Sequence, residues 1–197
     1  VQGVIAAWDY FRLGYSNGAN DDGSGVAGVL ALADRLKQDM PEEWGLVVCL
    51  TSAEEAGMLG AHHFLHSGGH RLDPKNDAVL NFDTVGAGNL SIITDTRTFT
   101  ATHYENDLVD AALETAKADE RFHGVRAVTS DYANVDSVWF AREGFDTLTL
   151  AAYNERGQFV NIHRPEDTLE NVAFEVIETT VDFAEAFLRR YWADKKP

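Results

Sequence analysis

Short apolar runs alternate along this chain with longer segments whose apolar residues recur at helical spacing. The strand-like runs are residues 4–7, 46–50, 77–83, 90–94 and 146–151. The helix-like segments are residues 26–36, 57–65, 105–117, 135–143 and 173–192. Such alternation is typical of a mainly parallel sheet with helices on both faces. We therefore expect an α/β protein, a three-layer α/β/α sandwich formed by residues 1–197 as a single domain.

The ends and composition of the chain restrict its class further. No window approaches about 18 uninterrupted apolar residues, and the start lacks a basic leader, so neither a transmembrane helix nor a signal peptide is expected. A soluble protein is predicted, without an indicated compartment. Because the sequence starts inside a predicted strand, we also interpret the chain as N-terminally truncated. The one cysteine, Cys49, excludes an internal disulfide and is expected to be a small buried apolar residue.

Acidic residues and one histidine follow the predicted strands. Asp21 lies in the Gly-rich loop after the first strand, Glu54 and Glu55 follow the second, and Asp83 ends the third. His163 lies in the loop before the last helix. Since parallel strands bring their carboxyl ends to one edge, these side chains are expected to converge there. Carboxylates with an imidazole suit one or two Zn²⁺ ions. For any single acid in so acidic a chain, a solvated turn remains the alternative.

Four sequence segments, in order, carry a resemblance to a known family. They are residues 18–25 (GANDDGSG), 51–61 (TSAEEAGMLGA), 81–86 (NFDTVG) and 162–168 (IHRPEDT). Their order and spacing extend over most of the chain, from residue 18 to residue 168. The sequence resembles the zinc-dependent aminopeptidases of the bacterial leucyl aminopeptidase type. Their relatives include glutaminyl cyclases and glutamate-carboxypeptidase-like proteins.

The resemblance implies a role for each of five residues. Asp21 would bridge two metal ions, Glu55 and His163 would bind one of them, and Asp83 would bind the other. Glu54 would be the general base that takes a proton from a metal-bound water. The implied function is a zinc-dependent exopeptidase of the aminopeptidase type, which removes N-terminal residues from a peptide substrate.

One position departs from the family pattern. The family has His-x-Asp at the end of its first strand, where this chain has Ala7-Trp8-Asp9. Asp9 matches the orienting Asp, but Ala7 has no atom that can bind a metal. One ion is therefore favoured over two, held by Asp21, Glu55 and His163. Two other interpretations stay open: Asp9 or His103 fills the gap, or the fold persists without catalysis.

The resemblance also indicates residues around the metal site. Asp136, with Phe140 and Gly144, matches part of a Ser-Asp-His-x-x-Phe segment that shapes the substrate side of the pocket. Tyr153 is the best candidate to contact a substrate oxyanion. His62 and His66 share one helix face, but a solvated face is favoured there over a metal site.

Two further functions remain as alternatives. The substitution at Ala7 allows a catalytically silent family member that acts as a binding module. A glutaminyl-cyclase-type acyltransferase needs only one zinc ion and uses the same types of ligand. Oligomeric state and side-chain specificity are not indicated by the sequence.

The charge of the chain generates the first prediction. With 32 acidic against 16 basic side chains, the net charge is −16, which repels nucleic acid and anionic membranes, so neither is an expected partner. The Debye length falls from about 10 Å at 0.1 M salt to about 3 Å at 1 M, so salt screens the self-repulsion. We interpret the chain as halophilic and expect its unfolding temperature to rise steeply toward molar KCl. An unfolding temperature that does not change with salt would contradict this interpretation.

Overall fold

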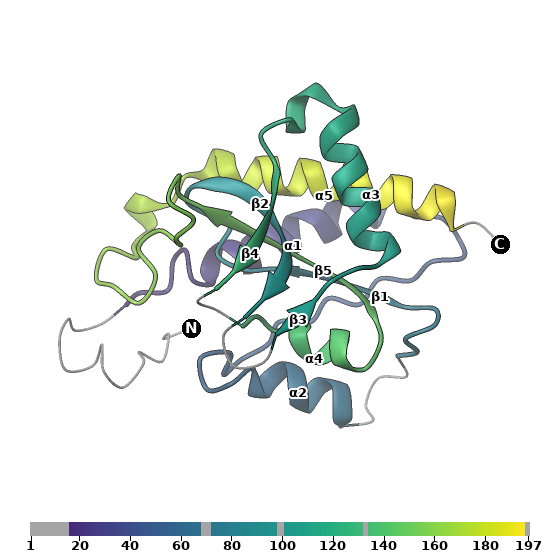
Figure 1. Ribbon diagram of the computed structural model, residues 1–197, viewed down its shortest axis with the longest axis horizontal. Coiled ribbons are helices and arrows are strands. Elements are labelled where there is room, and N and C mark those ends of the chain that lie inside the picture. The colour runs from purple at the N-terminus through teal and green to yellow at the C-terminus, as the bar shows by residue number, and fades with distance from the viewer. Residues whose placement is uncertain (1–15, 68–71, 98–100, 132–133, 196–197) are drawn as a thin grey trace.

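The computed structural model describes residues 16–67, 72–97, 101–131 and 134–195. The α-helices are α1 (Gly23–Leu36), α2 (Leu59–His66), α3 (Asp107–Ala118), α4 (Ser137–Arg142) and α5 (Phe174–Asp194). The strands are β1 (Ala78–Phe82), β2 (Asn89–Thr96), β3 (Thr102–His103), β4 (Arg126–Ser130) and β5 (Asp146–Tyr153). Two short 3₁₀ helices, η1 (Glu120–Phe122) and η2 (Leu169–Asn171), complete the described elements (Figure 1).

The strands form one mixed sheet in the order β1-β5-β2-β3, with β4 also paired to β2. The β1–β5 and β2–β4 pairings are parallel, whereas β2 runs antiparallel to both β5 and β3. The central strand β5 is buried along almost its whole length. Because both faces of this strand are covered, its threonines Thr147 and Thr149 are as fully buried as Leu148 and Leu150, which point to the opposite face.

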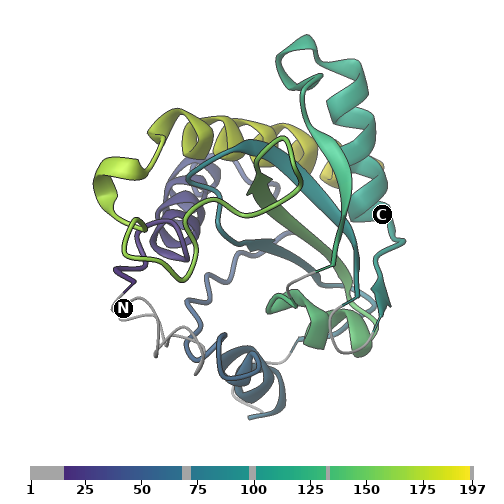
Figure 2. The same cartoon turned by 60° about the vertical axis from the view of Figure 1, so that its left-hand side comes forward.

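Helices cover both faces of the sheet. Helices α1, α3 and α5 pack together on one side, and α4 packs on the other side with α2 against it (Figures 1 and 2). The inward stripe of α5 includes Phe183 and Phe187, which are fully buried. This stripe has the spacing of one helical face, so burying it orients the helix across the sheet. The predicted three-layer α/β class is confirmed. The prediction of a mainly parallel sheet is wrong for the described strands, because β2 runs antiparallel to both β5 and β3.

The predicted strand at residues 46–50 is wrong for the described structure. The segment is irregular, and Leu46, Val47, Val48 and Leu50 are between 38% and 55% exposed. Cys49, expected to be buried, is exposed as well. The reason is that none of the described strands lies beside this segment to pair with its backbone. The predicted strand at residues 4–7 lies outside the described residues.

The topology brings several loops to one edge of the sheet. Asp83 directly follows β1, Asp21 lies just before α1, and His163 lies in the long connection between β5 and α5. No helix in the described residues is long and apolar enough to cross a membrane. The edge where these loops meet is where α/β folds place their ligand sites.

Candidate metal centre

The loop before α1 is fixed to the end of β1 by a buried carboxylate. Asp22 caps α1 by accepting a hydrogen bond from the Gly25 N–H at 3.1 Å. The same oxygen accepts a second hydrogen bond from the Thr84 N–H at 2.9 Å. A side chain at Gly25 would collide with the Asp22 carboxylate, so this turn requires glycine. Asp22 therefore holds Asp21 and Asp83 in neighbouring positions.

A second buried carboxylate, Asp167, fixes the same loop through other backbone N–H groups. Asp167 is 1% exposed and accepts hydrogen bonds from the N–H groups of Asn20 at 2.6 Å and Asp21 at 3.3 Å. The Ser16 hydroxyl donates to it at 3.3 Å. The Asn20 side chain in turn donates to the Val160 carbonyl at 3.0 Å. These bonds join the loop before α1 to the loop that carries His163.

Asp21, Glu55 and His163 converge at this edge. His163 Nε2 lies 2.5 Å from Glu55 Oε1 and 3.3 Å from Asp21 Oδ2. Among the described residues, these three form the one group of His, Cys, Asp and Glu ligands whose atoms lie within 4.8 Å of one another. Their side chains are 18% to 30% exposed, so the cluster is accessible to a ligand.

Several residues at this edge have unusual backbone conformations. Ala53, before Glu54, has a φ of 57°; Thr84, after Asp83, has 55°; and His163 itself has 55°. Non-glycine residues in this region are uncommon, and a β-branched threonine is a clear outlier. Such strain persists only where the surroundings fix it, and it concentrates at functional sites.

The neighbouring acids repel one another strongly. Burial, followed by repulsion from Asp83, Glu55, Asp136 and Asp21, raises the pKa of Glu54 to about 9. Burial and the charge of Asp21 raise the pKa of Asp83 to about 7, although Thr84 Oγ1 donates to its carboxylate at 2.7 Å.

The pKa values of Asp22 and His163 are also shifted by the neighbouring carboxylates. Burial and the charge of Asp83 also raise the pKa of Asp22 well above its ordinary value. Hydrogen bonds to Asp21 and Glu55 raise the pKa of His163 to about 10, so its ring carries positive charge among the acids. The edge is thus built to attract a cation.

Asp136 and Tyr153, the two predicted pocket residues, do not belong to the three-residue cluster. Thr51 Oγ1 donates to Asp136 Oδ2 at 2.5 Å, and burial raises the pKa of Asp136. The charge of Asp136 contributes to the raised pKa of Glu54. Tyr153 is 5% exposed and stacks on Phe159 with ring centroids 4.4 Å apart. Burial raises its pKa to about 12, so the hydroxyl stays protonated near neutral pH.

The other candidates fall elsewhere or outside the described residues. Ala7 and Asp9 belong to the part of the chain that the structure does not describe. His103 does not complete the site: it lies on β3, which β5 and β2 separate from β1, and its Nδ1 contacts Asp95 at 2.8 Å. His62 and His66 lie side by side on α2 with ring centroids 4.4 Å apart.

The three clustered side chains are of the types that zinc takes as ligands. Zinc takes carboxylate and imidazole ligands at about 2.0–2.2 Å, so two ligand atoms of a tetrahedral site lie about 3.4 Å apart. The 3.3 Å separation of His163 Nε2 from Asp21 Oδ2 is close to this value. The short contact between His163 and Glu55 would only have to open slightly. Two carboxylates and one imidazole leave a fourth position for water or substrate.

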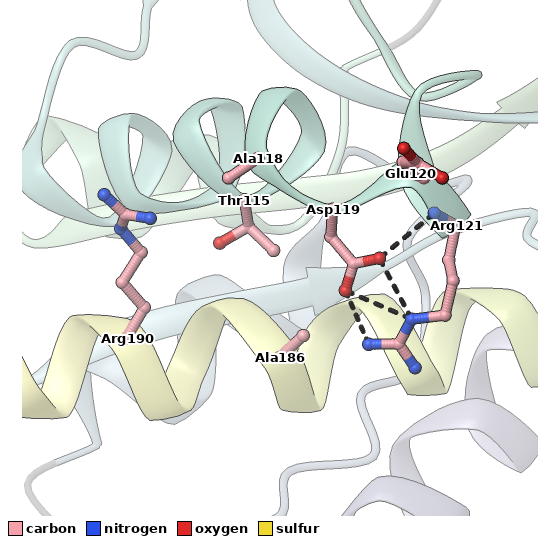
Figure 3. Close-up of a pocket in the computed structure, with 7 residues that line it drawn as sticks. All are labelled: Thr115, Ala118, Asp119, Glu120, Arg121, Ala186 and Arg190. Carbon is pink, nitrogen blue, oxygen red and sulfur yellow. Dashed lines mark hydrogen bonds and ion pairs between the residues drawn. The ribbon is translucent and has the colours of Figure 1, made fainter.

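A surface hollow away from this edge of the sheet offers no comparable chemistry. It lies between α3, η1 and α5, and Figure 3 shows its lining side chains. Arg121 and Asp119 neutralise each other there, with Nη2 and Oδ2 2.6 Å apart. Arg190 is paired with Glu114 outside the hollow. The metal centre at the sheet edge therefore remains the candidate functional site.

Comparison with known families identifies the family of this chain. The model of peptidase family M28 matches residues 4–188, and the chain belongs to this family. It is 42% identical over 163 residues to a vacuolar membrane protease of Lachancea thermotolerans. This match covers 82% of the chain but 16% of the relative. It is also 25% identical to aminopeptidase YwaD of Bacillus subtilis over 98% of the chain and 41% of the relative.

Solved structures show the same relationship. A zinc aminopeptidase from Bacillus subtilis superposes with a TM-score of 0.68 at 25% identity, covering 89% of this chain and 42% of that protein. A glutaminyl cyclase from Porphyromonas gingivalis gives a TM-score of 0.64 at 20% identity, covering 89% and 64%. The predicted family is thus confirmed, and a glutaminyl cyclase is among the similar structures, as predicted. The chain spans under half the length of the two curated relatives named above.

Sequence reasoning missed three residues that shape this site: Asn20, Asp22 and Asp167. All three lie in the motif segments, so their positions were visible. Their roles were not, because Asn20 and Asp167 are 147 residues apart in the sequence. The signal that could have found them is a short polar side chain next to a proposed ligand inside a turn.

The Asp167 contacts predict a positioning role. In Asp167→Asn, one acceptor oxygen becomes a donor, so some N–H and O–H groups of the Asp21 loop lose their partner. We expect zinc affinity, measured by chelator competition, to fall by about 10-fold to 100-fold. The control is Glu166→Gln, a substitution at the neighbouring exposed position, which should leave the zinc affinity unchanged. Equal affinities for the two variants would exclude this role.

The raised pKa values predict an unusual pH dependence for metal-free protein. Glu54, Asp83 and His163 all bind protons more tightly in the folded chain, so their contribution to stability is complete below their ordinary pKa values. For Asp83 this stabilisation is lost as the pH rises from about 4 through about 7, and for Glu54 it is lost as the pH rises from about 4 through about 9. For His163 it is lost as the pH rises through about 10.

In EDTA, the unfolding temperature should therefore fall more between about pH 5 and pH 9 in wild type than in Glu54→Gln. Added Zn²⁺ should restore much of the loss, since a ligand that binds only the folded state stabilises it. Thermal unfolding followed by circular dichroism measures both effects. Parallel pH profiles for the two proteins would show that Glu54 does not titrate as its surroundings imply.

Proposed function

We propose that residues 1–197 form one metallopeptidase-like catalytic domain, a zinc-dependent exopeptidase that removes N-terminal residues from peptides. The observation that carries the proposal is the convergence of Asp21, Glu55 and His163, with Glu54 adjacent. Membership of peptidase family M28 supports hydrolysis of peptides. The similar Bacillus subtilis protein, a zinc aminopeptidase, supports the metal and the exopeptidase type.

The three clustered side chains would hold one zinc ion, which when bound would polarise a carbonyl and offset the negative charge of nearby acids. His163 must give up its ring proton to become a ligand. Its pKa of about 10 reflects the same two carboxylates that would share the ion, Asp21 and Glu55. Asp167 and Asn20 keep the Asp21 loop in place while this exchange occurs.

Glu54 would be the general base. Its pKa of about 9 arises from burial and from four neighbouring acids, so it ionises near neutral pH only when that negative charge is balanced. Once ionised, the carboxylate accepts a proton from the attacking water. It then donates this proton to the amine that leaves the scissile bond. Because the surroundings hold its pKa high, the protonated form is accessible for this second step.

The remaining acids suit the substrate side of the site. A peptide with a free N-terminus carries a positive ammonium group, which the excess of carboxylates at Asp83 and Asp136 would attract. Tyr153 would stay protonated and serve as a donor, though its hydroxyl is buried. In the alternative with two ions, Asp83 would instead be a ligand of the second ion.

A single-zinc acyl transfer of the glutaminyl cyclase type is the second candidate. The one cluster of three ligands among the described residues favours it as much as it favours hydrolysis. The similarity to a glutaminyl cyclase structure concerns the fold. Assay of both an aminoacyl-anilide and an N-terminal glutaminyl peptide separates the two. A binding module without catalysis would act on neither substrate.

The adjacent glutamates provide the test of the mechanism. Glu54→Gln removes the base but no metal ligand, so kcat should fall by about 10²-fold to 10⁴-fold while zinc content is retained. Glu55→Gln removes a ligand and should lower the zinc content itself. Metal analysis alongside aminoacyl-anilide hydrolysis reads out both. Zinc-loaded wild type that is no faster than Glu54→Gln would end the enzyme hypothesis.

A further inference from the structure

Helix α2 carries two histidines that the metal centre at the sheet edge does not use. His62 and His66 are about one helical turn apart, so their side chains lie on the same side of the helix. Their ring centroids are 4.4 Å apart. This spacing alone is typical of a solvated helix face, so the surroundings of the two rings decide what the pair can bind.

The first histidine of the pair is held in place by packing. His62 is half-buried, and its ring contacts Trp139 of α4 in an edge arrangement with centroids 4.6 Å apart. Trp139 is restrained in turn by Arg142, whose guanidinium carbon lies 5.0 Å from the indole centroid. A ring that is already restrained loses little side-chain entropy when it binds an ion.

The backbone that carries the pair is fixed as well. Ala61 is fully buried, and Phe64 packs near Phe140 of α4 with ring centroids 6.3 Å apart. These contacts hold one side of α2 against α4, while the helix itself lies at the outside of the molecule (Figures 1 and 2). His66 is exposed. An ion can therefore reach the pair directly from solvent.

The electrostatic setting favours a cation. His66 is the last residue of α2, and the carbonyl groups at a helix C-terminus carry partial negative charge. The net charge of −16 adds a long-range attraction for cations. The guanidinium of Arg142 opposes this attraction and limits the affinity of the pair.

We propose that His62 and His66 form a metal site separate from the sheet edge, for a divalent transition metal that prefers imidazole. Cu²⁺ should bind more tightly than Ni²⁺ or Zn²⁺. Imidazole nitrogens bind such ions at about 2.0–2.1 Å, so the two ligand atoms would lie about 2.9–3.4 Å apart. Rotation about the side-chain torsions can bring rings with centroids 4.4 Å apart into this arrangement.

Water would fill the other coordination positions. Among the described residues, no third His, Cys, Asp or Glu forms a ligand group with this pair. Two protein ligands and several waters are typical of a weak, exchangeable site rather than of a structural zinc site, which has four protein ligands.

An ion bound by both histidines would also stabilise α2. The helix has eight residues, fewer than an isolated helix needs to be stable in water. A metal that bridges the two rings cross-links successive turns of this short helix. At the start of the helix, the Leu59 N–H donates to the Ala53 carbonyl at 3.1 Å, in the turn that carries Glu54. The metal would thus stabilise that turn indirectly.

Trp139 allows this site to be observed directly, because Cu²⁺ quenches the fluorescence of a tryptophan close to it. In a Cu²⁺ titration of the full chain, we expect a quenching step that Trp139→Phe removes. His66→Ala should move the midpoint to a Cu²⁺ concentration higher by on the order of tenfold or more, since one of two protein ligands is lost. The matched control is His63→Ala, at an exposed position of the same helix, which should leave the midpoint unchanged.

The unfolding temperature provides a second readout that does not depend on Trp139. Cu²⁺ should raise the unfolding temperature of wild type and of His63→Ala more than that of His66→Ala, because a ligand that binds only the folded state stabilises it. His66 is exposed, so its substitution should leave the metal-free fold intact, which far-UV circular dichroism checks.

Two outcomes would overturn the proposal. Equal midpoints for His66→Ala and His63→Ala would show that the pair does not bind the ion. A quenching step that is lost in His163→Ala but kept in His66→Ala would assign the copper to the centre at the sheet edge. None of these readouts uses peptidase activity or zinc binding, so they are independent of the proposed function.

Discussion

The repulsion among carboxylates at one edge of the sheet is the constraint on which the site depends. Glu54 and Asp83 sit where burial and neighbouring charges raise their pKa values to about 9 and 7. Such a cluster is unstable in an apolar setting unless a positive charge balances it. The charged ring of His163 supplies part of that balance through Asp21 and Glu55. A cation at the same place would supply more, which is why we propose metal binding here rather than a solvated acidic turn.

The backbone around the cluster is what keeps the acids together. Asp22 and Asp167 each accept two backbone N–H groups from the loops that carry the ligands. These buried carboxylates act as fixed acceptors. Their charge-assisted hydrogen bonds stabilise the loops and offset the repulsion among the acids of the site. The positive φ angles at Thr84 and His163 show the same principle, since strained residues require a surrounding structure that determines them.

The helices and most strands could be predicted because their periodicity is a local property of the sequence. Helix α5 spans Phe174–Asp194, against a predicted 173–192, and β1 spans Ala78–Phe82, against 77–83. Strands β3 and β4 were missed. Strand β3 has only two residues, and β4, Arg126–Ser130, has only two apolar residues, so neither carries a clear periodic signal. The motif segments also contain Asp21, Glu55 and His163, the three clustered side chains that we propose as ligands. Their bracing by Asp167 was not predictable, since a contact between residues 147 positions apart depends on the folded topology.

Residues 46–50 and Asp83 differ in how their backbones are paired. Asp83 is held by the β1–β5 pairing, which continues past the strand end, with the Asp83 N–H donating to the Leu150 carbonyl at 3.0 Å. On its other side, β1 lines a cavity that is also lined by residues 46–50, and no described strand pairs with either of them there. A strand-like sequence forms a strand only where a neighbouring backbone can accept and donate its hydrogen bonds, so the apolar run 46–50 stays irregular while the equally short β1 is regular.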